Sequence, residues 1–412
     1  MPLGLPLLAA VTLVVQSTQA PPAQAQLLQA LQANRLPLTM SDGRAAGPGW
    51  DWLVREARNA RFTLIGEEHG VAETAQLAAA LFAALRASGY SRVAIELSPP
   101  IAQDIEAAAR HNGRGVQGIE EFLKTPGIFT FYNLHDEAQF LADVVAAGPG
   151  NERVLWGFDR EIFSDRYLIA KLEPKVPAGA RAAFARLKQA STDAQAKNAR
   201  TGNPDDLFFL AEDSALATAL RASWPNPDPE SDAGLRTIEA SLAIETVERA
   251  GGAWPYMQRR AHWGRTNFAA LLRTGSPKIL MKFGYNHMIR GANYFNFFDL
   301  GTMADEVAAL TGERAFHILV LPGPGSRQAT LGGAGFASVA SDSVDELRAG
   351  DQRLTRVLSN PNAAGHEVLD LRPLRALAMR GLESWNADVV RTIHGYDAVV
   401  IWKGARASTG LK

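Results

Sequence analysis

Short apolar runs alternate with longer helix-like segments along most of this chain. Six of the runs are continuous and rich in Val, Ile, Leu and Phe. Runs of this length and composition are typical of strands that are buried on both faces of a parallel sheet. We therefore predict strands at residues 62–65, 93–97, 154–156, 279–283, 315–321 and 398–402.

The segment between the first two runs has the pattern of an amphipathic helix. Its apolar residues recur at intervals of three and four, and Gly89 stands where such a helix would end. The members of this pattern are Val71, Ala75, Ala78, Leu81, Phe82 and Leu85. A strand, a helix and a second strand form a βαβ unit. The chain is therefore predicted to be an α/β protein with a mostly parallel central sheet flanked by helices.

Residues 174–273 contain no strand-like run. Their Ala-rich periodic stretches predict a helical insertion, which Pro225, Pro227 and Pro229 interrupt. The Gly- and Pro-rich segment 322–335 is expected to be a long loop. We predict a signal peptide at residues 1–25 and a single α/β domain at residues 26–412 that carries the insertion.

The predicted signal peptide rests on the first 25 residues. An uncharged apolar run at residues 2–15 precedes Ala23-Gln24-Ala25, which has the small-x-small pattern of a cleavage site. A charged segment is absent in front of the run, because the first basic residue is Arg35. The run is shorter than the roughly 20 apolar residues of a membrane-spanning helix. We expect a periplasmic or secreted protein without stable membrane insertion after cleavage.

The charge balance and the lack of cysteine exclude several function classes. The chain has 42 Lys plus Arg against 43 Asp plus Glu, so no overall positive charge favours nucleic acid as a partner. With no cysteine, it has no disulfide, no thiolate nucleophile and no cysteine-bound zinc. Any metal would have to be held by His, Asp or Glu.

Polar residues follow four of the predicted strands at the point where each strand ends. In an open parallel sheet, ligands bind beyond the carboxyl ends of the strands, so these residues are candidates for a site. They are Glu67, Glu68 and His69 after the first strand, Glu96 after the second, Asp159 after the third and His287 after the fourth. Glu96 could instead cap the helix near Pro99, and Asp159 could be a turn carboxylate.

Histidine and carboxylate side chains together can activate water. A carboxylate fixes the tautomer of its histidine and stabilises the imidazolium that forms when water gives up a proton. Two histidines and further carboxylates could instead bind a metal ion that lowers the pKa of a bound water. Neither route needs a serine nucleophile, and the chain has no Gly-x-Ser-x-Gly motif.

These motifs resemble the superfamily of erythromycin esterases, ChaN-like proteins and TraB/Tiki proteins. The segment from Gly66 to His69 is similar to the ChaN-like Gly-Glu-x-His and is one residue shorter than the esterase motif. Glu96 resembles the acid after the second strand of both groups, and Asp159 the esterase Gly-x-Asp segment. Arg260 lies on a segment similar to the esterase helix before the last strand, and His287 matches that strand's final histidine. The first histidine of the esterase His-Asn-x-His is Gly284 here, so macrolide specificity is not implied.

The resemblance implies an esterase- or amidase-type hydrolase that acts on a small-molecule or peptide-like substrate, and the predicted signal peptide implies that it is exported. In it, His69 would be the general base, Glu67 or Glu68 would orient His69, and His287 and Arg260 would lie near the oxyanion. Two alternatives stay open. A Tiki-type enzyme would bind a divalent metal through His69, His287 and Glu96, with Asp159 as a further candidate, and a ChaN-like protein would bind haem or metal. The oligomeric state has no signal in the sequence.

Overall fold

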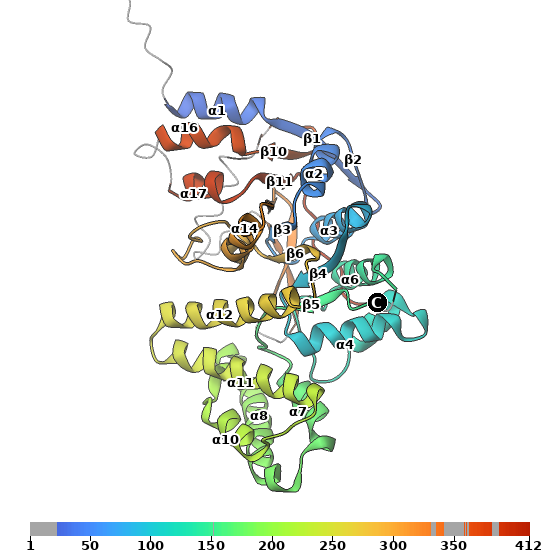
Figure 1. The fold of residues 1–412 in the computed structure, drawn as a ribbon, viewed down its shortest axis with the longest axis vertical. Helices are drawn as coiled ribbons and strands as arrows, with labels where there is room; N and C mark the ends of the chain where they lie inside the picture. The colour runs from blue at the N-terminus through green and yellow to red at the C-terminus, as the bar shows by residue number, and fades with distance from the viewer. Residues whose placement is uncertain are drawn as a thin grey trace, which may run out of the picture.

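A nine-stranded sheet forms the centre of the protein, with the strand order β2-β1-β10-β11-β7-β3-β6-β4-β5 (Figure 1). The structure, a computed structural model, describes residues 23–150, 152–330, 335–341, 358, 360, 362–380 and 387–412. Most of the sheet is parallel, and helices pack on both of its faces. The predicted α/β class is therefore confirmed.

The six predicted strands are the parallel part of the sheet. Neighbouring strands in the order β11-β7-β3-β6-β4-β5 all pair in parallel. Their bounds are Phe62–Glu67 for β3, Tyr90–Ile95 for β4, Leu155–Gly157 for β5, Lys278–Gly284 for β6, Ala315–Pro322 for β7 and Ala398–Trp402 for β11. Because they run in one direction, their carboxyl ends meet at one edge of the sheet.

Three antiparallel strands extend this sheet beyond β11, and the sequence pattern did not predict them. Strand β10 (His366–Asp370) pairs with β11, β1 (Arg35–Ser41) pairs with β10, and β2 (Arg44–Ala46) pairs with β1. The first of them in the chain, β1, mixes buried and exposed positions, as expected for a strand near the edge of a sheet.

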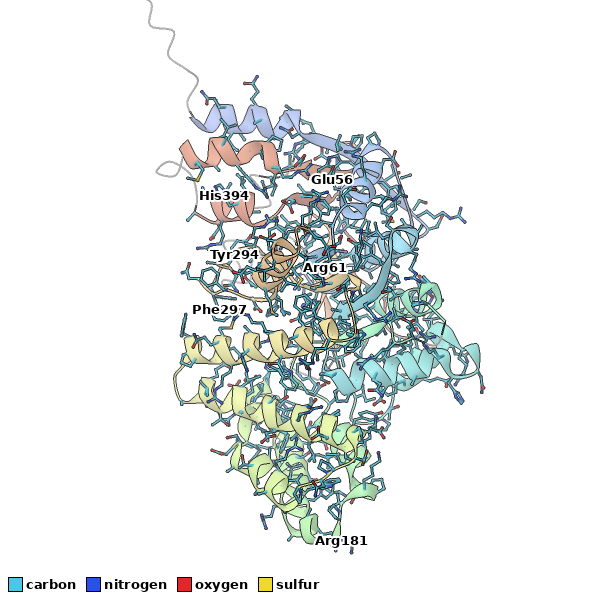
Figure 2. The ribbon with its side chains drawn as sticks, in the orientation of Figure 1. Glu56, Arg61, Arg181, Tyr294, Phe297 and His394 are labelled. Carbon is cyan, nitrogen blue, oxygen red and sulfur yellow. The ribbon has the colours of Figure 1, made fainter. Side chains whose placement is uncertain are left out.

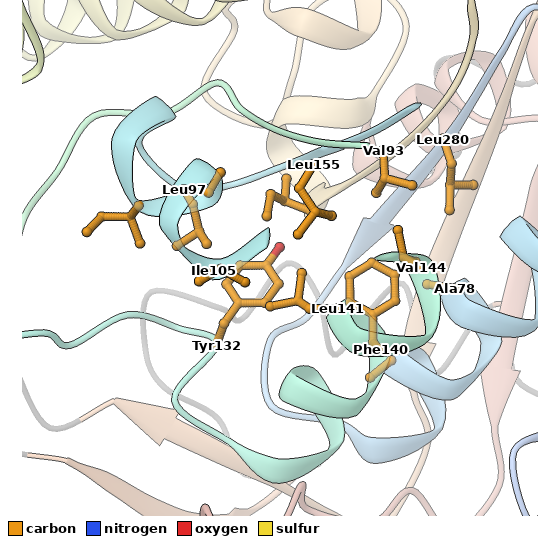
Figure 3. Packing of buried hydrophobic residues seen from close by; sticks show 14 of the residues in the cluster. Ala78, Val93, Leu97, Ile105, Tyr132, Phe140, Leu141, Val144, Leu155 and Leu280 are labelled. Carbon is orange, nitrogen blue, oxygen red and sulfur yellow. The ribbon is translucent and has the colours of Figure 1, made fainter. Parts of the chain in front are cut away.

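Two hydrophobic cores lie on opposite faces of the sheet, because side chains alternate along each strand. On β6, Leu280 belongs to one core and Met281 to the other. Figure 3 shows Val93, Leu155 and Leu280 packed near residues of α4 and α6 in the first core. The helices of this core include α2 (Pro48–Arg58), α3 (Ala72–Leu85), α4 (Pro99–Arg110), α5 (Gly115–Leu123) and α6 (His135–Ala147), and the core continues into the helices that follow β5.

The second core is covered by helices from both ends of the described chain. Helices α1 and α16 lie side by side although they are far apart in sequence (Figure 1). The helices of this core are α1 (Ala23–Ala33), α12 (Ala253–Leu272), α14 (Leu300–Leu310), α16 (Arg375–Arg380) and α17 (Ala387–Gly395).

Between β5 and β6 the described chain forms helices without a strand. They gather at the end of the molecule opposite α1, where Arg181 lies, and α12 lies between them and the sheet (Figures 1 and 2). Besides α12 they are α7 (Asp165–Leu172), α8 (Arg181–Thr201), α9 (Phe208–Ala211), α10 (Ala215–Ser223) and α11 (Pro229–Arg249). Within the described residues, no helix is long and apolar enough to cross a membrane.

One predicted loop is wrong, and the predicted signal peptide is mostly beyond the described residues. The segment 322–335 was expected to be a loop, but Ser326–Thr330 forms β8, which pairs antiparallel with β9 (Phe336–Ala340). Residues 1–22 of the predicted signal peptide lie outside the described residues, and its last three residues begin α1. Export stays a prediction.

Candidate active site

The turn after β3 separates the two adjacent glutamates. Glu67 is the last residue of the strand and is 1% exposed, and its Oε1 atom lies 3.1 Å from Nδ1 of His69. Glu68 points elsewhere, because neighbouring residues of an extended chain face opposite sides, and its Oε1 atom lies 3.3 Å from Nε of Arg327 on β8. The structure therefore gives Glu67, and not Glu68, the position that orients His69.

Close backbone packing and an aromatic ring hold the His69 turn in place. Gly70 has a φ of +85°, and a Cβ atom there would lie 2.3 Å from the carbonyl oxygen of Gln328 on β8. The ring of His69 stacks on that of Phe131, with centroids 4.8 Å apart and planes inclined by 6°. With 29% of its side chain exposed, His69 is accessible from one side.

Glu96 lies where both histidines converge. It follows β4 and is buried. Its Oε2 atom lies 3.4 Å from Nε2 of His69 and accepts a hydrogen bond of 2.6 Å from the backbone N–H of Gly284. Its Oε1 atom lies 3.4 Å from Nε2 of His287 and accepts a hydrogen bond of 2.8 Å from Arg260. The two histidines predicted from separate strands thus face the same carboxylate.

Strand β6 brings Gly284 and His287 to this carboxylate. A Cβ atom at Gly284 would lie 3.2 Å from Nε2 of His69 and 3.3 Å from Oε2 of Glu96, so any side chain here would enter the site. His287 is in the short helix α13 (Tyr285–Met288), and its Nδ1 atom lies 2.7 Å from Oδ2 of Asp299. Asp299 also accepts from the backbone N–H of Leu300 at the start of α14, which fixes its orientation.

Arg260 joins the helical segment to the sheet edge. Its guanidinium donates from Nε and Nη2 to the two carboxylate oxygens of Asp159, at 3.0 and 2.6 Å, and from Nη2 to Glu96. Paired donation of this kind fixes the plane of the guanidinium. The structure therefore brings together His69, Glu67, Glu96, Asp159, Arg260 and His287 from the predicted set.

Three further charged residues belong to this cluster and were missed in the sequence. Asp299 lies 12 residues beyond His287 and has no motif around it. Lys282 is on β6 with 0% of its side chain exposed, and it donates to Glu67 at 2.6 Å and to Glu137 of α6 at 2.9 and 3.1 Å. A lysine inside the apolar run of β6 was a signal that could have indicated a buried partner.

Two hollows flank the ion pair of Asp159 and Arg260. One, of about 220 Å³, is lined by both of these residues, His287, Asp299 and apolar side chains. The other, of about 290 Å³, is lined by Asp159, Glu96 and Phe131 together with residues 160–163. Both volumes include open solvent. The second hollow is lined by Glu96 and by Phe131, the ring that stacks on His69, so it places solvent next to the cluster.

Solved structures with the same arrangement of elements identify the fold. The chain shares the layout of an erythromycin esterase. That structure, a mutant of EreC in its open conformation, is 14% identical and matches with a TM-score of 0.57 over 88% of this chain and 95% of the esterase. A succinoglycan biosynthesis protein matches with a TM-score of 0.62 and a protein from Bacillus cereus with 0.59, each at 14% identity over 94% of this chain and 99% of the other.

More distant comparisons add little. A haem-binding ChaN from Campylobacter jejuni has a TM-score of 0.34 and 12% identity over 74% of this chain, so it gives the haem hypothesis no support. No family model and no curated protein sequence matches the chain. At these identities the likeness establishes the fold alone.

The electrostatics of the site favour the charged form of both histidines. Burial lowers the pKa of His69, but Glu67 and Glu96 outweigh it and raise this pKa to about 10. Burial and Arg260 lower the pKa of His287, but Asp299 and Glu96 raise it to about 9. Burial also opposes the ionised form of Glu96, yet the two histidines hold its pKa well below the usual range. With nothing bound, the site at neutral pH therefore holds two imidazolium ions around a carboxylate.

The cluster does not fit a divalent metal. Among the described residues, no group of three or more His, Asp or Glu side chains is arranged to hold a metal ion. The predicted ligand Glu96 already accepts from a backbone N–H and from Arg260, whose positive charge would repel a cation at the same oxygen. The metal-dependent alternative therefore lacks a suitable ligand set in this arrangement.

Proposed function

We propose that this protein hydrolyses ester or amide bonds with water that His69 activates. The observation that carries the proposal is the pair of histidines whose Nε2 atoms lie 3.4 Å from the two oxygens of Glu96. Each histidine is oriented through Nδ1 by a carboxylate, Glu67 for His69 and Asp299 for His287. A histidine held in this way presents Nε2 to a reacting group in a defined tautomer.

The proposed reaction uses the two histidines in opposite roles. Nε2 of neutral His69 takes a proton from water, whose oxygen forms a bond to the carbonyl carbon of the substrate. The positive charges of His287 and Arg260 stabilise the oxyanion that develops. When the tetrahedral intermediate collapses, the bond to the leaving alcohol or amine breaks, and His69 returns the proton to that group.

His69 must lose a proton before it can act as a base. Glu96 is one of the two carboxylates that raise the pKa of His69. A substrate that enters between Nε2 of His69 and Glu96 would break this contact and so lower the pKa toward neutrality. Because His287, whose pKa is about 9, must keep its proton, we expect kcat/KM, which reports on the free enzyme, to increase with pH to a maximum between about 9 and about 10 and to fall above it.

The test compares the wild-type chain with His69→Ala on a panel of p-nitrophenyl esters and aryl amides. We expect the variant to lose turnover by a factor of about 1,000 or more, because removal of a general base in a triad has effects of that order. His111→Ala is the matched control, since His111 is exposed on a turn outside the cluster. Far-UV circular dichroism shows whether each variant is folded. Equal turnover by wild type and His69→Ala would contradict the proposal, as would a wild type inactive on the whole panel.

A further inference from the structure

Lys282 is a charged residue in a place where packing alone would favour an apolar one. It lies on the face of β6 that is turned toward α6, two residues after Leu280 of the same core. Its amine lies 5.1 Å from the ring centroid of Tyr132 and 5.4 Å from that of Phe140, two rings that Figure 3 shows in this core. Burial of an ammonium group is costly unless its partners are well placed.

The partners of Lys282 lead to the proposed base. The amine and Nδ1 of His69 meet the same oxygen of Glu67, Oε1, at 2.6 and 3.1 Å. The other oxygen of Glu67, Oε2, is buried and has no hydrogen-bond partner among the described residues. The orientation of this carboxylate therefore depends on His69 and Lys282. Glu137 in turn holds the amine through both of its oxygens.

We propose that Lys282 and Glu137 are positioning residues for His69. Lys282 holds the Glu67 carboxylate ionised, with Oε1 toward Nδ1 of His69, and Glu137 holds the Lys282 amine in place. The second ring nitrogen of His69 then faces Glu96 and the reacting group. This role rests on the proposed hydrolysis, because a positioned Nε2 matters only if it handles a proton. The charged groups that face Glu67 are His69 from its own turn, Lys282 from β6 and Glu137 from α6.

The charge of Lys282 supports this role. Burial raises the pKa of Glu67, and Lys282 is the strongest influence that lowers it, so the carboxylate stays ionised. Glu137 behaves differently, because burial raises its pKa to about 7. Without Lys282, Glu67 would bind a proton more readily. It would then cease to raise the pKa of His69.

The test replaces Lys282 with Met in the full chain, which keeps an unbranched side chain of similar length and removes the charge. We expect kcat for p-nitrophenyl esters to fall about 100-fold with little change in KM, the size expected when a reacting group shifts by about 1 Å. In the chain labelled with 15N-histidine, the NMR titration midpoint of His69 should move down. Glu67→Gln should move it in the same direction.

Arg35→Met is the matched control. Arg35 is a buried cation on β1 that pairs with Glu367 at 3.0 Å, and three strands separate β1 from β3 in the sheet. This variant also loses a buried ion pair, but it should leave kcat and the His69 midpoint unchanged. If Lys282→Met does not fold, the double variant Lys282→Met/Glu137→Leu removes both charges and is measured instead.

The two readouts separate this inference from the hydrolysis on which it rests. Folded Lys282 variants whose kcat and His69 midpoint match those of Arg35→Met would overturn the positioning role. If the wild type hydrolyses none of the substrates, the NMR titration still decides whether Lys282 acts on His69. In that case, a lower His69 midpoint in Lys282→Met supports the effect of Lys282 on His69, although the proposed hydrolysis is wrong. An unchanged His69 midpoint overturns the positioning role as well as the hydrolysis.

Discussion

Both histidines of the site make the same kinds of contact, although they follow different strands. Each has its Nδ1 atom on a buried carboxylate and its Nε2 atom near Glu96. The charged groups next to these contacts differ. Glu67, the partner of His69, also contacts Lys282, whereas Arg260 lies near His287 and lowers its pKa. These neighbours alone leave His287 with the lower pKa of the two, so the proposed role of His69 as the base depends on a substrate that breaks its contact with Glu96.

Arg260→Lys tests whether the guanidinium contributes more than its charge. The guanidinium contacts Asp159 through two nitrogens and Glu96 through one of them, whereas the single amine of lysine cannot keep this geometry. We expect kcat to fall about 100-fold, as when one donor to an oxyanion is removed. The exposed neighbouring residue Arg259 supplies the control Arg259→Lys, which should keep wild-type kcat in the same ester assay. Equal activity of the two variants would show that the charge alone is sufficient.

Strands were predictable from the sequence where both of their faces are buried. All six apolar runs form parallel strands, because a strand covered on both sides is apolar at most of its positions. Strands β1 and β8 carry exposed or half-buried polar residues at several positions, so their runs are broken. The hairpin of β8 and β9 depends on contacts that sequence does not show, including the hydrogen bond from Gln328 to the carbonyl of Gly70.

The same reasoning explains which parts of the site were found. Residues that follow a buried strand can be placed at the sheet edge from topology, so the sequence predicts that Glu67, His69, Glu96 and His287 lie together. Lys282 and Glu137 lie within a strand and a helix, and their significance depends on a contact between elements 145 residues apart. The choice between Glu67 and Glu68 likewise required the direction of each side chain.

Gly284, at the end of β6, provides a test of whether the spacing between His69 and Glu96 matters. In Gly284→Ala, the new Cβ atom would lie 3.2 Å from Nε2 of His69 and 3.3 Å from Glu96, so these end groups must move apart. We expect kcat to fall about 10- to 100-fold, with a loss of stability of about 1 kcal/mol. Gly179→Ala is the control, because nothing lies within 4 Å of its added Cβ. A Gly284→Ala variant with wild-type kcat would show that the spacing of the two groups is not critical.

The buried positive and negative charges of the cluster nearly cancel, which affects the stability of the whole molecule. Four cations of the cluster are Lys282, His69, Arg260 and His287, and a fifth, Arg160 beside Asp159, is paired with Glu245. Four carboxylates that contact them are Glu67, Glu96, Asp159 and Asp299. Glu137 is a further carboxylate of the cluster. Because burial raises its pKa to about 7, Glu137 changes between the neutral and the negatively charged form near neutral pH, and the net charge of the cluster changes with it. Removing protons from the histidines leaves an excess of buried negative charge.

Because of this charge balance, we expect the protein to lose stability as the pH becomes alkaline. The pKa values of His287 and His69 in the folded protein, about 9 and about 10, exceed the ordinary histidine value of 6.5. Their contribution is therefore complete below pH 6.5 and is lost as pH increases through 9 and 10. Each extra proton bound by the folded chain reduces the free energy of unfolding by about 1.4 kcal/mol per pH unit.

Urea unfolding between pH 7 and 10 measures this dependence. We expect the wild type to lose stability faster than His69→Gln/His287→Gln, in which neither position can bind the extra proton. Lysine and tyrosine side chains outside the cluster titrate in both proteins and cancel in the difference. Parallel stability curves would mean that the folded chain does not retain these protons, and the two histidines would then be neutral at the pH where the site works.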